Sequence, residues 1–379
     1  IANSGAFIFG SNSSQTLSGI SSGTGSLTKN GSGILSLSGN NSNTGSIIVQ
    51  AGTMTLEHAN ALGIGGNISF TGGGVQYGTG VTTDLSSRIK NSTGAILIDT
   101  NGNNITFASV LDSTNTLGLT KNGSGTLSLS NDNTYSGATT INAGTLEITA
   151  TGQLTGGNHS GNIVNKGNFL FGSDSNQILA GVISSTGYLT KNGTGTLTLS
   201  GNNTYNGTTS INAGTLEITS TGRLGAGTYA ANITNNGSLI IGSNSAQTLS
   251  GIISGNGLSK TGDGTAILSG TNTYTGATTV SAGTLQAGDN AAFGTAAITV
   301  SGTGTLDLNG KTLTNAVTLT NGTLAGGTIS ASQLTLTNGT ISAILGSGAL
   351  TKSTAGSVTL TGANTFTGGT TLSAGTLVI

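Results

Sequence analysis

The stretch LTKNGTGTLTLSGNNTYNGTTSINAGTLEI, residues 189–218, decides the fold, because four other segments of the chain are copies of it. The copies begin at Leu27, Leu119, Leu258 and Leu350, and each closes with Ala-Gly-Thr. The third residue of every copy is a lysine: Lys29, Lys121, Lys191, Lys260 and Lys352, at intervals of 92, 70, 69 and 92 residues. Such self-similarity is typical of a repeat architecture, so we expect residues 1–379 to form a single solenoid.

Composition excludes several classes of partner and site. Only 6% of the residues are charged and the formal net charge is -1, so the chain lacks the basic surface that nucleic acid or an anionic membrane would bind. Cysteine is absent, which excludes disulfides and thiolate metal sites. No run of about 18 apolar residues occurs, so we expect no insertion of this segment into a membrane as a helix.

A shorter motif, Gly-x-Φ-x-Φ with Φ apolar or small, recurs along the chain. Its period of two is typical of a β-strand, and the glycine allows the backbone to turn before it. The motif begins at Gly5, Gly33, Gly52, Gly73, Gly94, Gly125, Gly144, Gly167, Gly195, Gly214, Gly237, Gly264, Gly283, Gly304, Gly322, Gly339, Gly356 and Gly375. These 17 steps average about 22 residues, which predicts an all-β parallel β-helix of about 17–18 rungs, a rung being one turn of the solenoid.

The steps between motifs are uneven. Inside each copy of the repeat the step is always 19 residues, which indicates a constant rung. Before four of the copies the step lengthens to 27, 28, 28 or 31 residues, and three related segments around Gln15, Gln177 and Gln247 fall in such steps. We interpret these as rungs with an extra bend or a protruding loop. Between Gly304 and Gly356 the steps shrink to 18, 17 and 17, which predicts a slimmer cross-section.

Three positions that recur among the copies can be interpreted structurally. The asparagine is expected to form the turn, since asparagine tolerates the left-handed conformation: Asn41, Asn133, Asn203, Asn272 and Asn364. The aromatic residue, Tyr135, Tyr205, Tyr274 or Phe366, is expected to cap a corner of the core. The lysine is expected to bond turn carbonyls or keep the surface soluble, so Lys191→Ala should change little, whereas Leu197→Asp should bury an unpaired charge and disrupt the fold.

The pattern L-T-K-x-G-x-G-T-L-x-L-S-G-x-N-T-Y-x-G-x-T-T-I-x-A-G-T-L resembles the passenger-associated transport repeat of bacterial autotransporters and related giant surface adhesins. The matching residues of one copy are Lys191, Gly193, Gly195, Thr196, Leu197, Gly201, Asn203, Thr204, Tyr205, Gly207, Ala213, Gly214 and Thr215. The resemblance implies a right-handed β-helix exported to the bacterial cell surface. It is specific for architecture and says little about activity.

No catalytic, cofactor or metal site is predicted. The aspartates Asp84, Asp99, Asp112, Asp132, Asp174, Asp263, Asp289 and Asp307 occupy unrelated repeat positions, unlike the clustered acids of β-helical carbohydrate-active enzymes. His58 and His159 stand at non-equivalent points, and each is expected on the surface. Glu147 and Glu217 are equivalent outward residues, three rungs apart and too distant to share calcium. Interruptions in the threonine rows also argue against an ice-binding surface.

The favoured function is a non-catalytic, extracellular stalk segment of a surface adhesin or autotransporter passenger. The alternative is a subunit that assembles end to end into a filament or matrix through exposed edge strands. The expected partners are accordingly other cells, surface receptors or further copies of the chain. Because Ile1 starts inside a unit and Ile379 closes one, we expect a piece of a longer protein.

Overall fold

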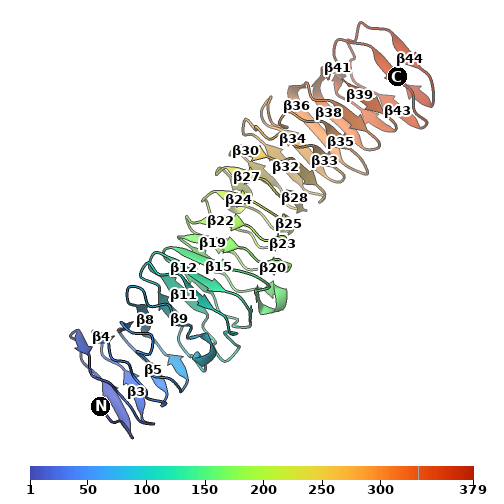
Figure 1. Ribbon diagram of the computed structural model, residues 1–379. Helices are drawn as coiled ribbons and strands as arrows, with labels where there is room; N and C mark the ends of the chain where they lie inside the picture. The colour runs from blue at the N-terminus through green and yellow to red at the C-terminus, as the bar shows by residue number, and fades with distance from the viewer. Residues whose placement is uncertain (332) are drawn as a thin grey trace. The chain divides into compact units, whose positions relative to one another are not determined.

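The computed structural model describes residues 1–331 and 333–379 and contains two compact units, residues Ile1–Gly195 and Thr196–Ile379 (Figure 1). Each unit is built of short parallel strands that stack rung upon rung. The prediction of an all-β parallel β-helix is therefore confirmed, with about 19 turns of about 20 residues against the expected 17–18 turns of about 22. The prediction of one continuous solenoid over residues 1–379 stays a prediction.

The first unit is made of strands of two to four residues. They are β1(Ala6–Phe9), β2(Gln15–Leu17), β3(Ser26–Lys29), β4(Ile34–Leu37), β5(Ile47–Val49), β6(Thr53–Leu56), β7(Ile68–Phe70), β8(Gly74–Tyr77), β9(Ile96–Asp99), β10(Ile105–Phe107), β11(Leu119–Asn122), β12(Thr126–Leu129), β13(Asp132–Asn133), β14(Thr139–Ile141), β15(Thr145–Ile148), β16(Gln153–Leu154), β17(Asn158–His159), β18(Ile163–Asn165), β19(Asn168–Phe171), β20(Gln177–Leu179), β21(Ile183–Ser184) and β22(Tyr188–Lys191). The 3₁₀ turns η1(Ser86–Arg88) and η2(Thr155–Gly157) lie between them. The longest sheet within this unit runs β2-β4-β6-β8-β9-β11-β14-β18-β21.

The second unit continues the same style with longer strands near its middle. Its strands are β23(Thr196–Leu199), β24(Thr209–Ile211), β25(Thr215–Ser220), β26(Thr228–Tyr229), β27(Ile233–Asn235), β28(Ser238–Ser243), β29(Gln247–Leu249), β30(Ile253–Gly255), β31(Leu258–Lys260), β32(Thr265–Leu268), β33(Thr278–Val280), β34(Thr284–Ala287), β35(Ile298–Val300), β36(Thr305–Leu313), β37(Val317–Leu319), β38(Thr323–Ile329), β39(Leu334–Leu336), β40(Gly339–Ile341), β41(Ile344–Leu345), β42(Leu350–Lys352), β43(Ser357–Leu360), β44(Thr370–Leu372) and β45(Thr376–Val378), with η3(Gly225–Gly227) after β25. Its longest sheet runs β26-β29-β32-β34-β36-β38-β40-β43-β45.

The core is a set of apolar columns inside each unit. In the first unit Leu127 pairs with Leu146, Leu146 with Phe169 and Phe169 with Leu189, and all four are fully buried. The alternate residues of the same strands face outward, as Ser128 and Glu147 do. Burial of each leucine contributes roughly 1.5–3 kcal/mol, so the columns supply the main stabilising term of the fold. The period of two that predicted inward and outward faces is confirmed.

Register explains the uneven spacing of the glycine motif. Thr126 pairs with Thr145 nineteen residues later, whereas Thr323 pairs with Thr340 seventeen residues later, so the rungs between Gly304 and Gly356 are short, as predicted. The long steps have another cause. β9, the strand that follows Gly94, pairs with β11 on the next rung. The next strand that a motif glycine precedes is β12, and it pairs with β10 in a different sheet. A long step is thus a full rung plus a change of sheet.

The prediction of a protruding loop around the three glutamines is wrong. Gln15, Gln177 and Gln247 each begin a short parallel strand, β2, β20 and β29. Gln177 and Gln247 are only 1% exposed and point into the fold. The composition of these segments, rich in serine and asparagine, suggested a loop because such residues usually face water. The side-chain amides of Gln177 and Gln247 instead bond the neighbouring rung, whereas Gln15 is exposed.

Candidate functional site

The repeat lysines are the most unusual side chains of the chain. Lys29, Lys121, Lys191, Lys260 and Lys352 all have 0% exposure. In β11 the lysine occupies an inward position, with Ile98 of the previous rung and Ile141 of the next as its register partners. The expectation that these lysines lie on the surface, on which the mild effect of Lys191→Ala rested, is therefore wrong.

Backbone carbonyl groups surround each ammonium group. Nζ of Lys121 donates to the carbonyl oxygens of Asn122 at 2.9 Å, Gly123 at 2.7 Å and Ala143 at 3.2 Å. Asn122 ends β11, Gly123 begins the turn after it, and Ala143 opens the closing Ala-Gly-Thr one rung later. The other copies repeat the pattern: Lys29 donates to Gly31 and Ala51, Lys191 to Gly193, Lys260 to Gly262 and Ala282, and Lys352 to Thr354. The predicted bonding to turn carbonyls is confirmed.

The glycine of the closing Ala-Gly-Thr completes this corner. Gly144 has a φ of 65°, a left-handed conformation that favours glycine, and the equivalent glycines of the other four copies have φ between 61° and 73°. A Cβ on Gly144 would lie 2.3 Å from the carbonyl oxygen of Gly125 and 3.0 Å from Nζ of Lys121. Glycine is therefore needed both for the backbone angle and because the lysine fills the space above it. We define this arrangement of lysine, turn carbonyls and glycine as the lysine corner.

Burial controls the electrostatics of the lysine corner. It lowers the pKa of Lys121 and of Lys191 to about 8, while Asp99 and Asp174 respectively oppose the shift. Burial lowers the pKa of Lys29 and Lys260 as well. In two copies an aromatic ring lies beside the ammonium group. Nζ of Lys29 and of Lys191 is 5.5 Å from the ring centroid of Phe9 and Phe171 respectively, which are their register partners on the previous rung. Such a ring favours the charged form of the lysine and partly offsets its desolvation.

Burial of the repeat lysines should be visible in amine reactivity. During brief labelling of the native protein with an N-hydroxysuccinimide ester, we expect the exposed Lys166 to react and the five repeat lysines to remain unmodified, because their Nζ atoms are out of contact with solvent. After unfolding in urea all should react. Peptide mass spectrometry measures the sites, and labelling of Lys121 at the rate of Lys166 would contradict the buried corner.

Stability should pass through a maximum near pH 10. Between about pH 8 and 10 the unfolded chain, whose lysines keep their ordinary pKa of 10.5, binds more protons than the folded chain, so the free energy of unfolding rises with pH. Burial raises the pKa of Tyr135, Tyr229 and Tyr274 to about 12, so above pH 10 the unfolded chain loses protons first and stability falls. Urea midpoints measured from pH 7 to 11 check this. A steady decline from pH 8 upward would refute it.

The repeat asparagines link rungs and do not adopt left-handed turns. Oδ1 of Asn272 accepts from the N–H of Ile253 in the previous rung at 2.7 Å, and its Nδ2 donates to the carbonyl of Ala292 in the next at 2.7 Å. Asn41 does the same with Ser21 and Ala61. None of the five repeat asparagines is among the described residues with positive φ, so that part of the prediction is wrong. Asn133 and Asn364 likewise accept from the N–H of Leu111 and Leu345 on the previous rung. The Nδ2 groups of Asn133 and Asn203 donate within their own turns, to the carbonyls of Asn131 and Gly201, so buried backbone groups are satisfied in both ways.

The aromatic position of the repeat caps the core, as predicted. Tyr135, Tyr205 and Tyr274 are fully buried, whereas Phe366 is half-buried. Each tyrosine places its Oη 2.8–2.9 Å from the Oγ1 of the threonine four residues later, Thr139, Thr209 or Thr278. The hydroxyl is thus satisfied inside the corner, and no ring of the three is free to bind a ligand.

The carboxylates serve turns, as their scattered positions indicated. Oδ1 of Asp99 accepts from the N–H of Asn101 and that of Asp307 from the N–H of Asn309, at 2.8 and 2.9 Å. Glu147 accepts from Ser128 on the neighbouring strand at 2.8 Å. Among the described residues no group of three His, Asp or Glu side chains could hold a metal ion. The prediction of no catalytic or metal site has no direct test and stays a prediction.

The two histidines differ in environment. His58 is half-buried, and its Nδ1 accepts from the N–H of Asn60. His159 is fully buried, so its predicted surface position is wrong. The signal that could have placed it is the 70-residue interval between two copies, because residue 159 then corresponds to Tyr229, another fully packed aromatic side chain. Sequence reasoning compared the two histidines with each other and missed this correspondence.

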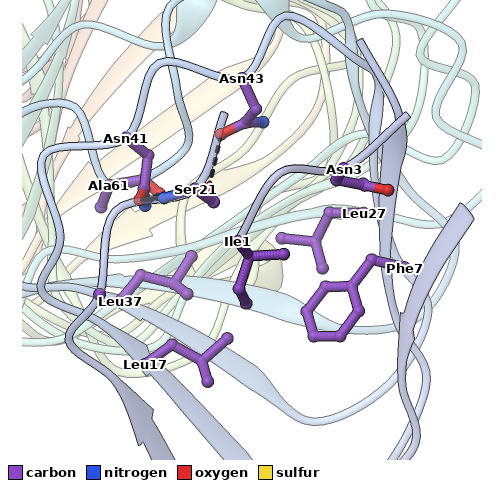
Figure 2. Close-up of a pocket in the computed structure, with 11 residues that line it drawn as sticks. Ile1, Asn3, Phe7, Leu17, Ser21, Leu27, Leu37, Asn41, Asn43 and Ala61 are labelled. Atoms are coloured by element: carbon purple, nitrogen blue, oxygen red, sulfur yellow. Dashed lines mark hydrogen bonds between the residues drawn. The ribbon is translucent and has the colours of Figure 1, made fainter. Parts of the chain in front are cut away.

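Two cavities among the described residues bear on ligand binding. One, of about 30 Å³, lies among the first rungs, where Ile1, Leu27 and Leu37 face the side chains of Asn41 and Asn43, as Figure 2 shows. There the two asparagines bond the N–H and hydroxyl of Ser21 at 2.7 and 3.1 Å. The other, of about 150 Å³, lies beside Phe366. Both are smaller than the roughly 300 Å³ at which small-molecule sites usually begin.

Comparison with known proteins identifies the repeat. Five segments match the family described as Passenger-associated-transport-repeat, at residues 27–56, 119–148, 189–218, 258–287 and 350–379. The chain is also similar to the Adhesin BmaC autotransporter of Brucella suis biovar 1 (strain 1330), with 32% identity over 424 aligned positions. The alignment covers 88% of this chain but only 12% of that adhesin. No solved structure matches the chain.

These comparisons confirm the resemblance to autotransporter passenger repeats at the same five segments that the sequence predicted. They also confirm the expected extracellular position at the bacterial cell surface. No helix within the described part of the chain combines the length and the apolar character that crossing a bilayer requires. The chain is thus similar to one segment of an autotransporter adhesin.

Proposed function

We propose, from its five passenger-associated transport repeats, that the chain is a non-catalytic structural segment that holds adhesive parts of a longer surface protein away from the cell. One observation carries the proposal: the lysine and asparagine that recur in every copy, and the tyrosine present in three of the five, bond the fold itself. These repeated side chains therefore stabilise the β-helix and do not form a repeated binding surface. The similarity to one segment of a much larger adhesin supports the same structural function.

An enzymatic function has less support. β-Helical carbohydrate-active enzymes need two carboxyl groups held on one face, or acids with a cation. Here Asp99 and Asp307 are bound to backbone N–H groups two residues on, and their second oxygens accept from Gln76 and Gln286 at 3.0 and 2.7 Å. These carboxylates have the partners of turn and surface groups. We therefore propose that the chain performs no reaction.

The spacer function can be tested by changing the number of repeats. Deleting residues 119–188 joins Gly118 to Leu189, the residue equivalent to Leu119, and so removes one 70-residue period in register. A binding module displayed on bacteria through this chain should keep its affinity while its height above the membrane falls with the deletion and rises when the period is duplicated. Fluorescence-based axial distance measurement reads the height, and target capture by whole cells reads the consequence.

Experiments on the purified chain can contradict the spacer proposal. A spacer should neither bind saturably to cell monolayers nor compete with adhesion by the displaying bacteria. Saturable binding would show that this segment is itself adhesive and would overturn the spacer proposal. Sedimentation velocity over a concentration series tests the alternative assembly, because particles that grow with concentration would favour a filament-forming or matrix-forming subunit.

A further inference from the structure

Two excursions of the β-helix have the same construction. We name them the first arc, residues 150–161, and the second arc, residues 220–231; each follows the last strand of a repeat, β15 or β25, and leads to the next rung at β18 or β27. Left-handed residues fall at the same places in both: Ala150, Thr155, Gly156 and Gly157 in the first, and Ser220, Gly225, Ala226 and Gly227 in the second. Each arc also contains a 3₁₀ turn, η2 or η3, followed by a two-residue strand. The second arc is therefore an internal reference for the first.

A buried glutamine secures both arcs in the same way. Oε1 of Gln177 accepts from the N–H of Leu154 at 2.7 Å, and its Nε2 donates to the carbonyl of the same residue at 3.1 Å. Gln247 bonds Leu224 at the same two distances. The glutamine contacts are therefore alike in the two arcs. Of the residues that differ between the arcs, the one that ordinarily titrates near pH 6.5 is His159, which stands where the second arc has Tyr229.

The side chain at this position is tyrosine in the second arc and histidine in the first. Tyr229 lies edge-on to Tyr205, with ring centroids 5.5 Å apart, and its Oη bonds Oγ1 of Thr209 at 2.7 Å and the carbonyl of Gly207. His159 lies edge-on to Tyr135 at 6.0 Å, and its Nδ1 is 2.7 Å from Oγ1 of Thr155. Its Nε2, although buried, has no hydrogen-bond partner among the described residues.

Protonation of His159 is unfavourable in this arrangement. The neutral ring satisfies one nitrogen with Thr155 and leaves the other without a partner. Protonation would make both nitrogens donors, so that Nε2 would carry an N–H without an acceptor and the ring would carry a buried charge. Burial accordingly lowers the pKa of His159 below its ordinary 6.5. As pH falls below about 6.5 the open arc binds the proton and the closed arc does not, so closure weakens as pH falls.

No neighbouring charge compensates for this cost. β20, which pairs with β17 through His159 and Leu179, contributes Gln177, Ile178 and Leu179, none of them titratable in this range. On the opposite side the packed groups are Tyr135, whose Oη is bonded to Thr139, and Asp132 of β13, whose Oδ1 accepts from the N–H of Gly156 at 2.8 Å. The Asp132 bond holds the exposed end of the arc and gives His159 no direct partner.

We propose that the first arc is an acid-sensitive element of the fold, which opens when His159 is protonated while the second arc, closed by Tyr229, stays shut. Opening releases the short pairing of β13 with β16 and uncovers Leu154 and Tyr135. The β-helix of the first unit would therefore expose an apolar corner at mildly acidic pH and cover it again at neutral pH. Its opening is local, because the columns of the core contain no other histidine.

Hydrogen–deuterium exchange of the full chain tests the proposal, with rates corrected for the intrinsic effect of pH. Between pH 7.5 and 5.0 the opening constant of the first arc should increase by up to about 30-fold, the limit for a histidine that titrates at 6.5 when open and stays neutral when closed. The equivalent amides of the second arc should not change. Equal responses of both arcs, or a response of neither, would overturn the proposal.

Variants and a spectroscopic readout make the test specific. The double substitution His159→Tyr with Thr155→Gly gives these two positions the residues of the second arc and should abolish the pH response of the first, whereas His58→Gln should leave that response intact. Because the chain has two histidines, His58→Gln also assigns the two imidazole signals in NMR of ¹³C-histidine-labelled protein. A His159 ring that titrates near 6.5 in the native state would contradict the proposal even if exchange were too fast to follow.

Discussion

Replacing Lys121 with alanine should lower the free energy of unfolding by about 3–5 kcal/mol, although substitution of a surface lysine usually changes it by less than about 0.5 kcal/mol. The change removes the donor to the carbonyl groups of Gly123 and Ala143 and opens a cavity between two rungs, while the carbonyl of Asn122 still accepts from the N–H of Thr100 at 3.1 Å. Each buried carbonyl without a partner costs about 1–3 kcal/mol. Urea denaturation followed by circular dichroism measures the loss.

Two further variants separate the causes. Lys121→Met keeps the volume and removes the buried charge, so we expect a loss of only about 1–2 kcal/mol. Lys166→Ala, at an exposed lysine of the same unit, should stay within about 0.5 kcal/mol of the unsubstituted protein. If Lys121→Ala proves as mild as Lys166→Ala, the lysine corner does not stabilise the fold.

Leu319→Asp should prevent the second unit from reaching its native packing. Leu319 is fully buried in β37, with Val300 and Leu336 as its register partners on the rungs either side. The substitution removes a leucine, which alone costs about 2–5 kcal/mol, and adds a buried carboxylate with no cation beside it. The sequence-derived variant Leu197→Asp should behave alike, since Leu197 is also fully buried. Loss of the cooperative thermal transition in circular dichroism is the expected observation.

The neighbouring residue offers a matched control. Thr318 is the outward residue of the same strand, between Thr299 and Thr335 in register, and Thr318→Asp introduces the same charge one position away. Its effect should stay within about 0.5 kcal/mol. Leu319→Ala gives an intermediate case in which the unit still folds, with a loss of about 2–5 kcal/mol. Similar losses for both aspartate variants would mean that β37 is not packed as described.

The fold was predictable because alternation with a period of two and turn glycines are local signals that each copy restates. The same alternation in Leu119-Thr120-Lys121 places the lysine inward, and only its charge argued for the surface. Charge is a poor guide here because three carbonyl groups are oriented to receive it, and that geometry exists only once two rungs are stacked.

The partners of asparagine and glutamine were harder to predict for a related reason. The groups that Asn272 bonds are on Ile253 and Ala292, about twenty residues away in either direction, and which backbone groups meet there depends on rung length. Rung length was misjudged where the glycine motif changes sheet, so the register around Gln177 and Gln247 was out of reach. His159 could have been placed by aligning it with Tyr229, since that comparison uses the sequence alone.

The buried lysines also bear on how long such a chain survives among host proteases. Enzymes that cleave after lysine or arginine must draw an extended segment into their active site, and five of the ten such residues in this chain lie inside the β-helix. Arg88 is held as well, with its guanidinium donating to the carbonyls of Leu62, Gly63, Gly65 and Gly66. Digestion by trypsin-like enzymes is left with few starting points, chiefly Lys166 on the surface of the first unit. Lysine is usually a site of cleavage, but the buried lysines of this chain help to hold the backbone in a conformation that such proteases cannot bind.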